Sequence, residues 1–380
     1  MPFVIAVPKE LAMGEQRVAT VPEVVQKLTK SGHEVRIEHG GGKSAYYSDD
    51  LFIAAGAKIV QTRIDLFTGA RIVLGVQPLT VAEIDLLAEG TIVIGFMNAT
   101  RNLEAVARMR DRKITAFALE LVPRITRAQS MDALSSQATA GGYVAAILGA
   151  ANSPKFLPML TTAAGTIRPA TVLILGAGVA GLMAIATAKR LGAVVEAYDV
   201  RRAAGEQVRS LGARFLELEI NAEGKGGYAR ELTPEEREKE QEMVTAAVAR
   251  ADIVITTASI PGRKAPLLIT KGTVATMRPG AVIVDLAAES GGNCELTQPG
   301  RTIQEHGVTI LGPLNLPAQI PFHSSQMYAK NLHAFLMLLF DKEGGLVREF
   351  TDEILAASLL VHAGEVRHGP TRDLLSERKT

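Results

Sequence analysis

The sequence lacks three features, and each absence excludes a class of protein. It has one cysteine, Cys294, which excludes an intramolecular disulfide framework and fits a reducing compartment. Its 41 basic and 40 acidic residues leave no large excess of charge, which argues against nucleic acid or an acidic membrane surface as the main partner. No apolar run approaches the roughly 20 residues of a membrane-spanning helix. The start, MPFVIAVPKE, has no signal-peptide pattern, so we expect neither a membrane segment nor a secretion signal.

The 380 residues are 47% hydrophobic, which is enough for two domains with sizeable cores. In the first half, short runs rich in β-branched residues alternate with helical patterns. The predicted strands are Phe3–Val7, His33–Glu38, Arg71–Val76, Thr91–Phe96 and Ile114–Leu119. Strands that alternate with helices indicate a parallel sheet with helices on both faces. This half contains no GxGxxG sequence, so we interpret it as a Rossmann-like domain without a nucleotide of its own.

The second half contains the stretch around which the chain is organised, residues 170–200. Thr171–Leu175 has the composition of a buried strand, and GAGVAG at residues 176–181 follows it directly. Small and apolar residues then recur at helical spacing from Val179 to Leu191, and Ala193–Tyr198 is a second predicted strand. This order of strand, glycines, helix and strand is typical of a dinucleotide-binding unit.

Each glycine of this stretch has a distinct physical function in such a unit. Gly176 permits the tight turn from strand to helix, Gly178 lets the backbone approach a pyrophosphate, and Gly181 lets helix and strand pack closely. The helix start at Val179 offers free N–H groups to the anion. The alternative is a glycine-rich turn in a βαβ unit that binds no nucleotide.

The acid expected of a dinucleotide-binding unit is Asp199, 18 residues after Gly181. A carboxylate there accepts hydrogen bonds from both adenosine ribose hydroxyls and repels a 2′-phosphate, which favours NAD(H) over NADP(H). Val200 and Arg201 follow it and belong to the same predicted site. Arg201 and Arg202 weaken the preference for NAD(H), because an arginine at this place accepts a phosphate.

Two long helices are predicted at Ser130–Ala151 and Phe322–Phe340. Glycines inside a helix cost about 1 kcal/mol each relative to alanine, so Gly141-Gly142 indicates either close packing against a helix or cofactor, or a break. The predicted fold class is α/β, with two Rossmann-like domains, each a mostly parallel sheet with helices on both faces, joined by long bridging helices. We expect the first domain to be discontinuous, residues 1–134 with 325–380, and the NAD(H)-binding domain to comprise residues 135–324.

A polar segment, ELVPRITRAQSMDALSSQ at residues 120–137, joins the two halves, where open α/β sheets bind ligands. Five polar side chains lie on its loop or on the first turns of the predicted helix: Arg124, Arg127, Gln129, Asp132 and Ser135. A nicotinamide carboxamide has one acceptor and two donor hydrogens, which Gln, Asp and Ser side chains together satisfy. The alternative is a helix with a polar first turn that Ser130 caps.

A second polar segment, residues 221–242, is charged and punctuated by glycine. Thr233-Pro234-Glu235-Glu236 has the pattern of a helix start. Before it, Asn221–Leu232 is predicted to be an exposed loop, which either closes over a ligand or connects two elements passively.

These motifs together resemble a known family. PRITRAQSMDALSSQ, TTAAGTIRPATVLILGAGVAGLMAIATAKRLGA and VDLAAESGGN are similar to the NAD(H)-binding domain I, or alpha subunit, of proton-translocating nicotinamide nucleotide transhydrogenase. The resemblance covers essentially the whole chain, from PKE and RVATVPEVV near its start to HGPTRDLL near its end. Alanine dehydrogenase is a relative that shares the two-domain plan.

The resemblance implies functions for individual residues. In the family the RAQSMD loop holds the nicotinamide ring, and the mobile loop that closes over the site matches GGYAREL. The implied catalytic residues are Arg124, Gln129, Asp132, Ser135 and Tyr228. The implied NAD(H)-binding residues are Arg124, Arg127, Gln129, Asp132, Ser135, Gly176, Gly178, Val179, Gly181, Asp199, Val200, Arg201, Gly227 and Tyr228.

The resemblance also implies a reaction and partners. NADH donates hydride to NADP+ on a domain III subunit, coupled to proton translocation by membrane domain II, in a transhydrogenase of the Si-specific/Re-specific type. Because the sequence ends at Thr380 without a membrane segment, we expect both partners to be separate polypeptides. The family further implies a homodimer, no metal, and a cytoplasmic position on the inner face of the membrane through the partner subunits.

Two other functions stay open as alternatives. An enzyme of the alanine dehydrogenase type needs a lysine and a histidine to hold and protonate a keto acid. At the lysine position this sequence has Gly75, in IVLGVQP, and after the next strand it has GFMNATRN without a histidine. Only Arg17 remains as a clamp for a carboxylate. The second alternative is an NAD-binding regulator without enzymatic activity.

Overall fold

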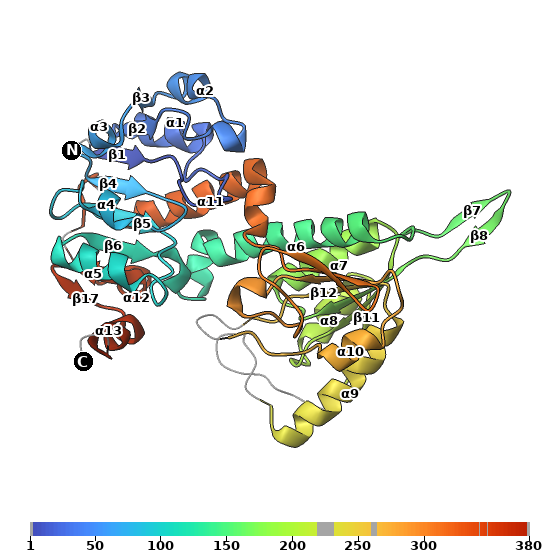
Figure 1. The fold of residues 1–380 in the computed structure, drawn as a ribbon. Coiled ribbons are helices and arrows are strands. Elements are labelled where there is room, and N and C mark those ends of the chain that lie inside the picture. Colours follow the sequence, from blue (N-terminus) through green and yellow to red (C-terminus); the bar gives the residue numbers. More distant parts are fainter. Residues whose placement is uncertain (1–2, 219–231, 260–263, 342, 348, 378–380) are drawn as a thin grey trace. The chain divides into compact units, whose positions relative to one another are not determined.

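The computed structural model of the chain describes residues 3–218, 232–259, 264–341, 343–347 and 349–377 (Figure 1). The chain forms two compact units. Unit 1 comprises Met1–Gln137 and Ala318–Thr380, and unit 2 comprises Ala138–Pro317. Helix α6 (Ala133–Asn152) begins in unit 1 and ends in unit 2. The predicted α/β fold class is confirmed. The domain limits at 134/135 and 324/325 stay a prediction, because packing alone does not show which segments fold as domains.

The sheet of unit 1 is doubly wound. Its strand order is β17-β16-β6-β5-β4-β1-β2-β3, in which β1 to β6 run parallel and β16 and β17 run antiparallel. The order reverses between β1 and β4, because β1 pairs with β2 on one side and with β4 on the other. The strands are β1 (Val4–Val7), β2 (Glu34–Glu38), β3 (Lys58–Val60), β4 (Ile72–Leu74), β5 (Ile92–Gly95), β6 (Thr115–Ala118), β16 (Leu359–His362) and β17 (Glu365–Val366).

Helices cover both faces of this sheet. On β1, Ile5 and Val7 pack in one core cluster with α1 and α11, whereas Ala6 packs in another with α3 and α5. This alternation follows from the two-residue repeat of a strand and explains why the central strands β1, β4 and β5 carry no polar side chain. The helices are α1 (Pro22–Lys30), α2 (Asp49–Ala54), α3 (Arg63–Phe67), α4 (Val81–Ile84), α5 (Leu103–Asp111), α11 (Pro321–Leu336), α12 (Glu353–Ser358) and α13 (Gly369–Glu377).

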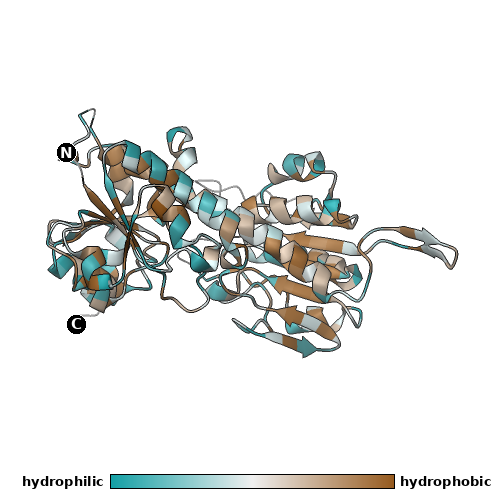
Figure 2. Cartoon of the chain, turned by 90° about the horizontal axis from the view of Figure 1, so that it is seen from above, coloured by the Kyte–Doolittle hydropathy of each residue, from teal (hydrophilic) through white to brown (hydrophobic). Residues whose placement is uncertain are grey.

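Unit 2 repeats the plan. Its large sheet has the order β11-β10-β9-β12-β13-β15-β14, with only β14 antiparallel, and the order reverses between β9 and β12. The strands are β9 (Thr171–Leu175), β10 (Val194–Tyr198), β11 (Arg214–Phe215), β12 (Ile253–Thr256), β13 (Val282–Asp285), β14 (Thr302–Glu305) and β15 (Val308–Leu311). The helices of unit 2 besides α6 are α7 (Val179–Arg190), α8 (Ala204–Ser210), α9 (Pro234–Arg250) and α10 (Lys271–Ala275). In Figure 2 most strands of the large sheets are hydrophobic, and hydrophilic residues lie mainly on the helices and at the edges of the sheets.

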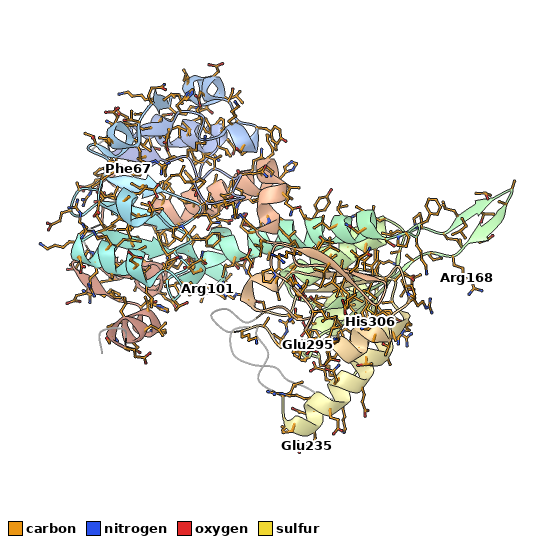
Figure 3. All side chains as sticks on the ribbon, viewed as in Figure 1. Phe67, Arg101, Arg168, Glu235, Glu295 and His306 are labelled. Atoms are coloured by element: carbon orange, nitrogen blue, oxygen red, sulfur yellow. The ribbon has the colours of Figure 1, made fainter. Side chains whose placement is uncertain are left out.

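The helix start predicted at Thr233 is confirmed. The Thr233 side chain accepts from the Glu236 backbone N–H, and the Glu236 carboxylate accepts from the Thr233 N–H, which together form a capping box for α9. The sequence analysis did not predict β3, the antiparallel β14, the antiparallel β16–β17 pair or a two-stranded hairpin. The hairpin, β7 (Leu160–Thr162) with β8 (Gly165–Ile167), extends away from the large sheet of unit 2, with Arg168 after it (Figure 3). Within the described ranges, no helix has the length and apolarity needed to cross a bilayer.

Candidate functional site

The glycine-rich turn lies where the strand order of unit 2 reverses. In doubly wound sheets ligands bind at this position, beyond the carboxyl ends of the strands. Gly176 follows β9 with a φ of 99°, a conformation that residues with a Cβ rarely adopt. Thr257 follows the neighbouring strand β12, and its Oγ1 donates to the Gly176 carbonyl at 2.9 Å. The sequence analysis missed Thr257, although its place directly after a predicted strand next to the turn was a usable signal.

The other two glycines of the turn differ in the space around them. A Cβ on Gly181 would lie 1.9 Å from the Gly176 carbonyl oxygen, so this position admits no side chain. A Cβ on Gly178 would meet no atom of the described residues within 4 Å. Gly181 thus fits the predicted close packing of helix and strand, and Gly178 leaves open space beside the first N–H groups of α7, which have no partner within the helix. This open cradle fits a diphosphate.

Gly142 of α6 packs closely against the start of α7, which follows the same turn. A Cβ on Gly142 would lie 2.0 Å from the carbonyl oxygen of Ala180, in the first turn of α7. Helix α6 continues unbroken through Gly141 and Gly142. Of the alternatives that the sequence left open for these glycines, close helix packing is therefore the one found.

Asp199 is in contact with the glycine-rich turn, but the chain itself already engages its carboxylate. Oδ2 accepts from the Ala177 backbone N–H at 2.8 Å, and Oδ1 accepts from the Arg201 backbone N–H and Nε at 2.8 and 2.9 Å. Arg201 Nη2 also donates to Oδ2 at 2.8 Å. The Asp199 side chain is only 7% exposed. The carboxylate therefore fixes the turn, and Arg201 covers its outer edge.

The five predicted residues of the polar loop all belong to unit 1, but they have different environments. Arg124 and Gln129 are exposed. Arg127 forms a two-bond ion pair with Asp352, at the start of α12, with N–O distances of 2.7 and 3.0 Å. Hydrogen bonding to Arg127 is the main cause that keeps the Asp352 pKa low. Arg127 thus ties the loop to α12, a contact that the sequence analysis did not foresee because 225 residues separate the partners.

Asp132 and Ser135 are brought together, and they form the start of α6. Asp132 Oδ1 accepts from the Ser135 backbone N–H at 2.9 Å, and Ser135 Oγ donates to Asp132 Oδ2 at 2.5 Å. The predicted start of this helix at Ser130 is wrong, and so is the alternative in which Ser130 caps it. Residues Thr126–Met131 form a short 3-10 helix instead, so α6 begins at Ala133 and Asp132 provides the cap.

Two further predicted site residues, Gly227 and Tyr228, lie outside the described residues. So does most of the predicted loop Asn221–Leu232.

In unit 1, a carboxylate of the chain occupies the place where the strand order reverses. Glu10 follows β1, and its two oxygens accept from the backbone N–H groups of Val76 and Gln77, just after β4, at 2.6 and 3.1 Å. Burial raises the Glu10 pKa to about 7, although these two donors act in the opposite direction. A Cβ on Gly75 would lie 3.9 Å from Glu10 Oε1. Unit 1 thus has an acid where unit 2 has glycines.

A buried ion pair lies on the same connection from β1 to α1. Arg17 donates from Nε and Nη2 to the two oxygens of Glu15, at 2.8 and 2.6 Å. Burial opposes the charge of Glu15, but hydrogen bonds and the charge of Arg17 prevail and lower the Glu15 pKa to about 2. Arg17 Nη1 donates to Gln137 Oε1 at 2.8 Å. The clamp that the sequence suggested for an external carboxylate therefore holds a carboxylate of the chain.

Asp285, at the end of β13, is a second residue that the sequence analysis missed. Its fully buried carboxylate accepts from the backbone N–H groups of Asn293 and Cys294 at 2.8 and 3.1 Å and from Thr256 Oγ1 at 2.8 Å. It thereby fixes the loop after β13 beside the carboxyl end of β12. Burial raises the Cys294 pKa to about 11, which fits a packed thiol and not a nucleophile.

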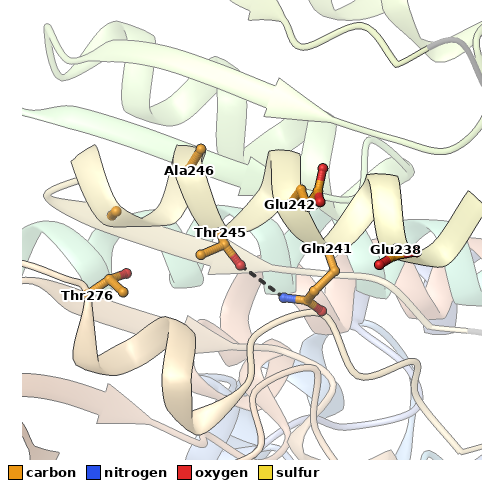
Figure 4. A pocket seen from close by; sticks show the side chains of 7 residues that line it. Glu238, Gln241, Glu242, Thr245, Ala246 and Thr276 are labelled. Carbon is orange, nitrogen blue, oxygen red and sulfur yellow. Dashed lines mark hydrogen bonds between the residues drawn. The ribbon is translucent and has the colours of Figure 1, made fainter.

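A pocket on unit 2 lies apart from these predicted residues. It is formed by α9 and α10 and lined by Glu238, Gln241, Glu242, Thr245, Ala246, Ala249 and Thr276 (Figure 4). Gln241 Nε2 donates to Thr245 Oγ1 at 3.1 Å across its wall. Its charged lining residues are both acidic, so the pocket does not suit an anionic dinucleotide.

Comparison with known proteins decides the family. The family model of the alanine dehydrogenase/PNT N-terminal domain matches residues 6–141, and that of the C-terminal domain matches residues 145–369. The chain belongs to the alanine dehydrogenase/PNT family. The resemblance inferred from the sequence motifs is thereby confirmed, and the two matches together span both units.

Within this family, individual relatives differ in similarity. The first part of NAD(P) transhydrogenase subunit alpha from Rhodospirillum rubrum is 47% identical over 96% of this chain and 97% of its own length. The crystal structure of transhydrogenase from Sinorhizobium meliloti has a TM-score of 0.88 at 44% identity, over 96% of this chain and 99% of that one. An L-alanine dehydrogenase structure has a TM-score of 0.84 at 27% identity, with 99% of both chains covered.

Proposed function

We propose that this chain is the NAD(H)-binding component of a proton-translocating transhydrogenase of the Si-specific/Re-specific type. When bound, NADH supplies the hydride that NADP+ accepts on a partner subunit, and a membrane-spanning partner couples the transfer to proton translocation. The observation that carries the proposal is the open glycine turn at Gly176–Gly181, at the reversal point of unit 2. The transhydrogenase names of the relatives at 47% and 44% identity support it.

In unit 2, the backbone and one acid of the chain bind the nucleotide. The first N–H groups of α7, from Val179 onward, hold the diphosphate above Gly178. Asp199, with Val200 and Arg201 beside it, takes the adenosine ribose hydroxyls. Because Arg201 covers the outer edge of Asp199, a ribose that binds there replaces part of that ion pair.

In unit 1, polar side chains orient the nicotinamide carboxamide. Gln129, Asp132 and Ser135 supply the amide, carboxylate and hydroxyl groups that match its one acceptor and two donor hydrogens. Arg124 and Arg127 belong to the same loop, and Gly227 and Tyr228 close over the site. The chain needs no acid–base pair for this reaction, because hydride passes directly between two ring carbons and the demand is for orientation.

An alanine dehydrogenase activity is the second candidate, and its support is weaker. Such an enzyme must protonate a keto oxygen as hydride leaves. Gly75 supplies no side chain for this, and Arg17 is bonded to Glu15.

We further propose that the chain acts as a homodimer at the inner face of the membrane, attached through its partner subunits.

A mixing experiment tests the proposal. The purified chain, with NADH and with its NADP+-loaded partner subunits, should show rapid hydride exchange that depends on both components. The chain alone should show no NAD-dependent deamination of alanine. Alanine turnover by the chain alone, or no exchange with the partner, would contradict the proposal.

The Gln129→Ala variant tests the orienting role separately. The rate of hydride transfer should fall by at least about 10-fold, while the NADH affinity changes by less than about 3-fold, since positioning governs the rate. Gln26→Ala, which removes an exposed glutamine on α1, is the matched control and should change neither. Equal losses in rate and affinity for Gln129→Ala would count against a positioning function.

A further inference from the structure

One buried side-chain amide joins two loops at the carboxyl edge of the unit 2 sheet. Asn293 lies on the loop after β13, and its exposed fraction is 0%. Its Nδ2 donates to the Ala258 carbonyl at 2.9 Å and to the Pro266 carbonyl at 2.7 Å. Both carbonyls belong to the connection between β12 and α10. A single nitrogen therefore fixes the distance between two points of that connection.

The backbone that carries this amide is attached to the ends of two neighbouring strands. The Asn293 N–H donates to Oδ2 of Asp285, the last residue of β13, at 2.8 Å. Asp285 Oδ1 accepts from Oγ1 of Thr256, the last residue of β12, at 2.8 Å. The orientation of the amide follows from its neighbours, because an exchange of Oδ1 and Nδ2 would place an oxygen against two carbonyl oxygens. Asn293 thus presents two donors from a fixed position.

The connection that Asn293 holds is in contact with the glycine-rich turn. Thr257 donates from its N–H to the Leu175 carbonyl at 2.8 Å and from Oγ1 to the Gly176 carbonyl at 2.9 Å. A Cβ on Gly176 would lie 3.1 Å from the backbone nitrogen of Ala258. Contacts therefore continue from Asn293 through Ala258 to Gly176, and the amide helps to fix the surroundings of the turn.

Stability alone is a weak explanation for a buried amide at this place. Ala258 is half-buried and Pro266 is exposed, so both acceptors lie close to solvent, which is the usual alternative partner of a carbonyl. In the part of the chain that the structure describes, Asn293 Oδ1 has no hydrogen-bond partner. A buried polar atom without a partner lowers stability. Natural proteins retain such unfavourable features mostly where a fixed geometry serves function.

We infer that Asn293 is a positioning residue for hydride transfer: through Ala258 it holds the connection after β12 where that connection orients the nicotinamide half of NADH. A dinucleotide binds across the point where the strand order reverses, with one half on each side. Asp199 follows β10 on one side, where the adenosine half is proposed to bind, and Ala258 follows β12 on the other. This inference rests on the proposed function, because it assigns the nicotinamide half to the β12 side.

The Asn293→Ala variant, which removes both bonds of the amide, tests the inference in the complete chain. At saturating NADH, single-turnover hydride transfer to NADP+ on the partner subunits should slow by at least about 10-fold, because orientation governs this step. The dissociation constant for NADH should change by less than about 3-fold. The affinity for AMP, which lacks the nicotinamide half, should not change. A merely structural function of Asn293 would lower both affinities together.

A second readout needs neither a partner subunit nor turnover. The fluorescence anisotropy of the nicotinamide ring in bound NADH should be lower in Asn293→Ala than in the wild type, because a poorly oriented ring moves more freely. Asn293→Asp keeps the size of the side chain, and its ionised carboxylate repels both carbonyls. Once protonated, the carboxyl group donates to one of them, so the anisotropy of this variant should rise toward the wild-type value as pH falls from about 8 to about 5.

Thr297→Val is the matched control. Thr297 Oγ1 donates to the same acceptor, Asp285 Oδ2, at 2.6 Å, so this variant loses a bond of the same cluster without a change at Ala258. Its melting temperature should fall, while the transfer rate and the ring anisotropy stay at their wild-type values. If Asn293→Ala does not fold, Asn293→Asp is compared with this control instead.

The outcomes separate this inference from the proposed function. Slower transfer and lower ring anisotropy in Asn293→Ala, but not in Thr297→Val, support the inference. Wild-type rate and anisotropy in Asn293→Ala overturn it, and so do equal losses in the control, equal losses of affinity for AMP and NADH, or the absence of a pH response in Asn293→Asp. If the wild-type chain exchanges no hydride with its partner, the proposed function fails, and the anisotropy alone then decides whether Asn293 orients the ring.

Discussion

The two units share one architecture, and they differ at the point where the strand order reverses. In unit 2 that point carries glycines, an open space at Gly178 and the start of a helix. In unit 1 it carries Glu10 and Glu15, which accept the hydrogen bonds of nearby backbone and side-chain donors. One sheet therefore offers donors to an outside anion, whereas the other uses its donors for anions of its own.

This difference shows that ligand capacity lies in a few residues after the strands and not in the fold. Both sheets have the same order around their first strand, and in both that strand is buried and contacts helices. The comparison predicts that substitutions at the reversal point of the unit 2 sheet affect nucleotide binding strongly. Substitutions at the reversal point of the unit 1 sheet should affect the stability of the fold instead. Three experiments test it, from the largest expected effect on nucleotide binding to the smallest.

The largest effect is expected from Gly181→Ala. The new Cβ would lie 1.9 Å from the Gly176 carbonyl oxygen, and because that is a backbone atom, the turn itself must shift. We expect the NADH affinity to fall by more than about 100-fold and the melting temperature to fall with it. Fluorescence titration with NADH and thermal melts measure both quantities.

Gly178→Ala provides the control for this change. Its Cβ meets no atom of the described residues within 4 Å, so the fold should tolerate it. The methyl group would project into the space proposed for the diphosphate, so the affinity should fall by about 10-fold at an unchanged melting temperature. Loss of stability without any loss of affinity in Gly178→Ala would show that the space has another use.

Much of the unit 2 turn was predictable, because its information is local. The strand Thr171–Leu175 and the helix start at Val179 were predicted at the residues where the structure has them. The capping box at Thr233 also lies within four consecutive residues. In each case the physical requirement falls on neighbours in the sequence, such as a turn, a close approach or a helix cap.

The contacts at the reversal point of the unit 1 sheet were not predictable, because the residues that form them are distant in sequence. Arg17 and Gln137 are 120 residues apart, and Tyr328, whose hydroxyl donates to the Gly75 carbonyl at 2.7 Å, is 253 residues from its partner. The wrong helix start predicted at Ser130 also results from a partner that is distant in sequence. Asn331 of α11 donates to the Ser130 carbonyl at 2.8 Å, a contact between segments 201 residues apart that fixes the 3-10 helix in place of a longer α6.

A smaller effect on nucleotide binding is expected from Asp199→Asn. The amide keeps an oxygen for the Ala177 N–H but loses the charge that pairs with Arg201. The NADH affinity should fall by about 10-fold, since hydrogen bonds to a charged group are worth about 1.5–3 kcal/mol. The preference for NADH over NADPH should also shrink, because Arg201 is freed to pair with a 2′-phosphate. Titrations with both nucleotides measure this preference.

Asp252→Asn is the matched control at the opposite edge of the same sheet. Asp252 accepts from the Thr171 backbone N–H at 2.9 Å and pairs with Lys155, so its bonds resemble those of Asp199. It lies at the amino end of β9, away from the glycine turn. This variant should lose stability and keep its nucleotide preference. If Asp252→Asn changed the preference for NADH over NADPH, this would contradict the assignment of that preference to the carboxyl edge of the sheet.

The smallest effect on nucleotide binding is expected from Glu10→Gln, which should leave the NADH affinity unchanged and alter the pH dependence of stability. The folded-state pKa of Glu10 is raised to about 7 from an ordinary value of 4.5, so the folded chain binds this proton more tightly than the unfolded chain does. Stability should therefore fall as pH rises from about 5 to about 8, by about 2–3 kcal/mol, and the variant should lack this fall. Glu15 acts in the opposite sense and at lower pH, because its pKa of about 2 makes stability decline only as pH drops below about 4.5.

The side-chain amide introduced by Glu10→Gln places a donor near the Gln77 N–H and lowers stability at every pH. The quantity to compare is therefore the slope of the unfolding free energy, measured with denaturant, against pH. Parallel slopes for the variant and the wild type would show that Glu10 is not the group that titrates.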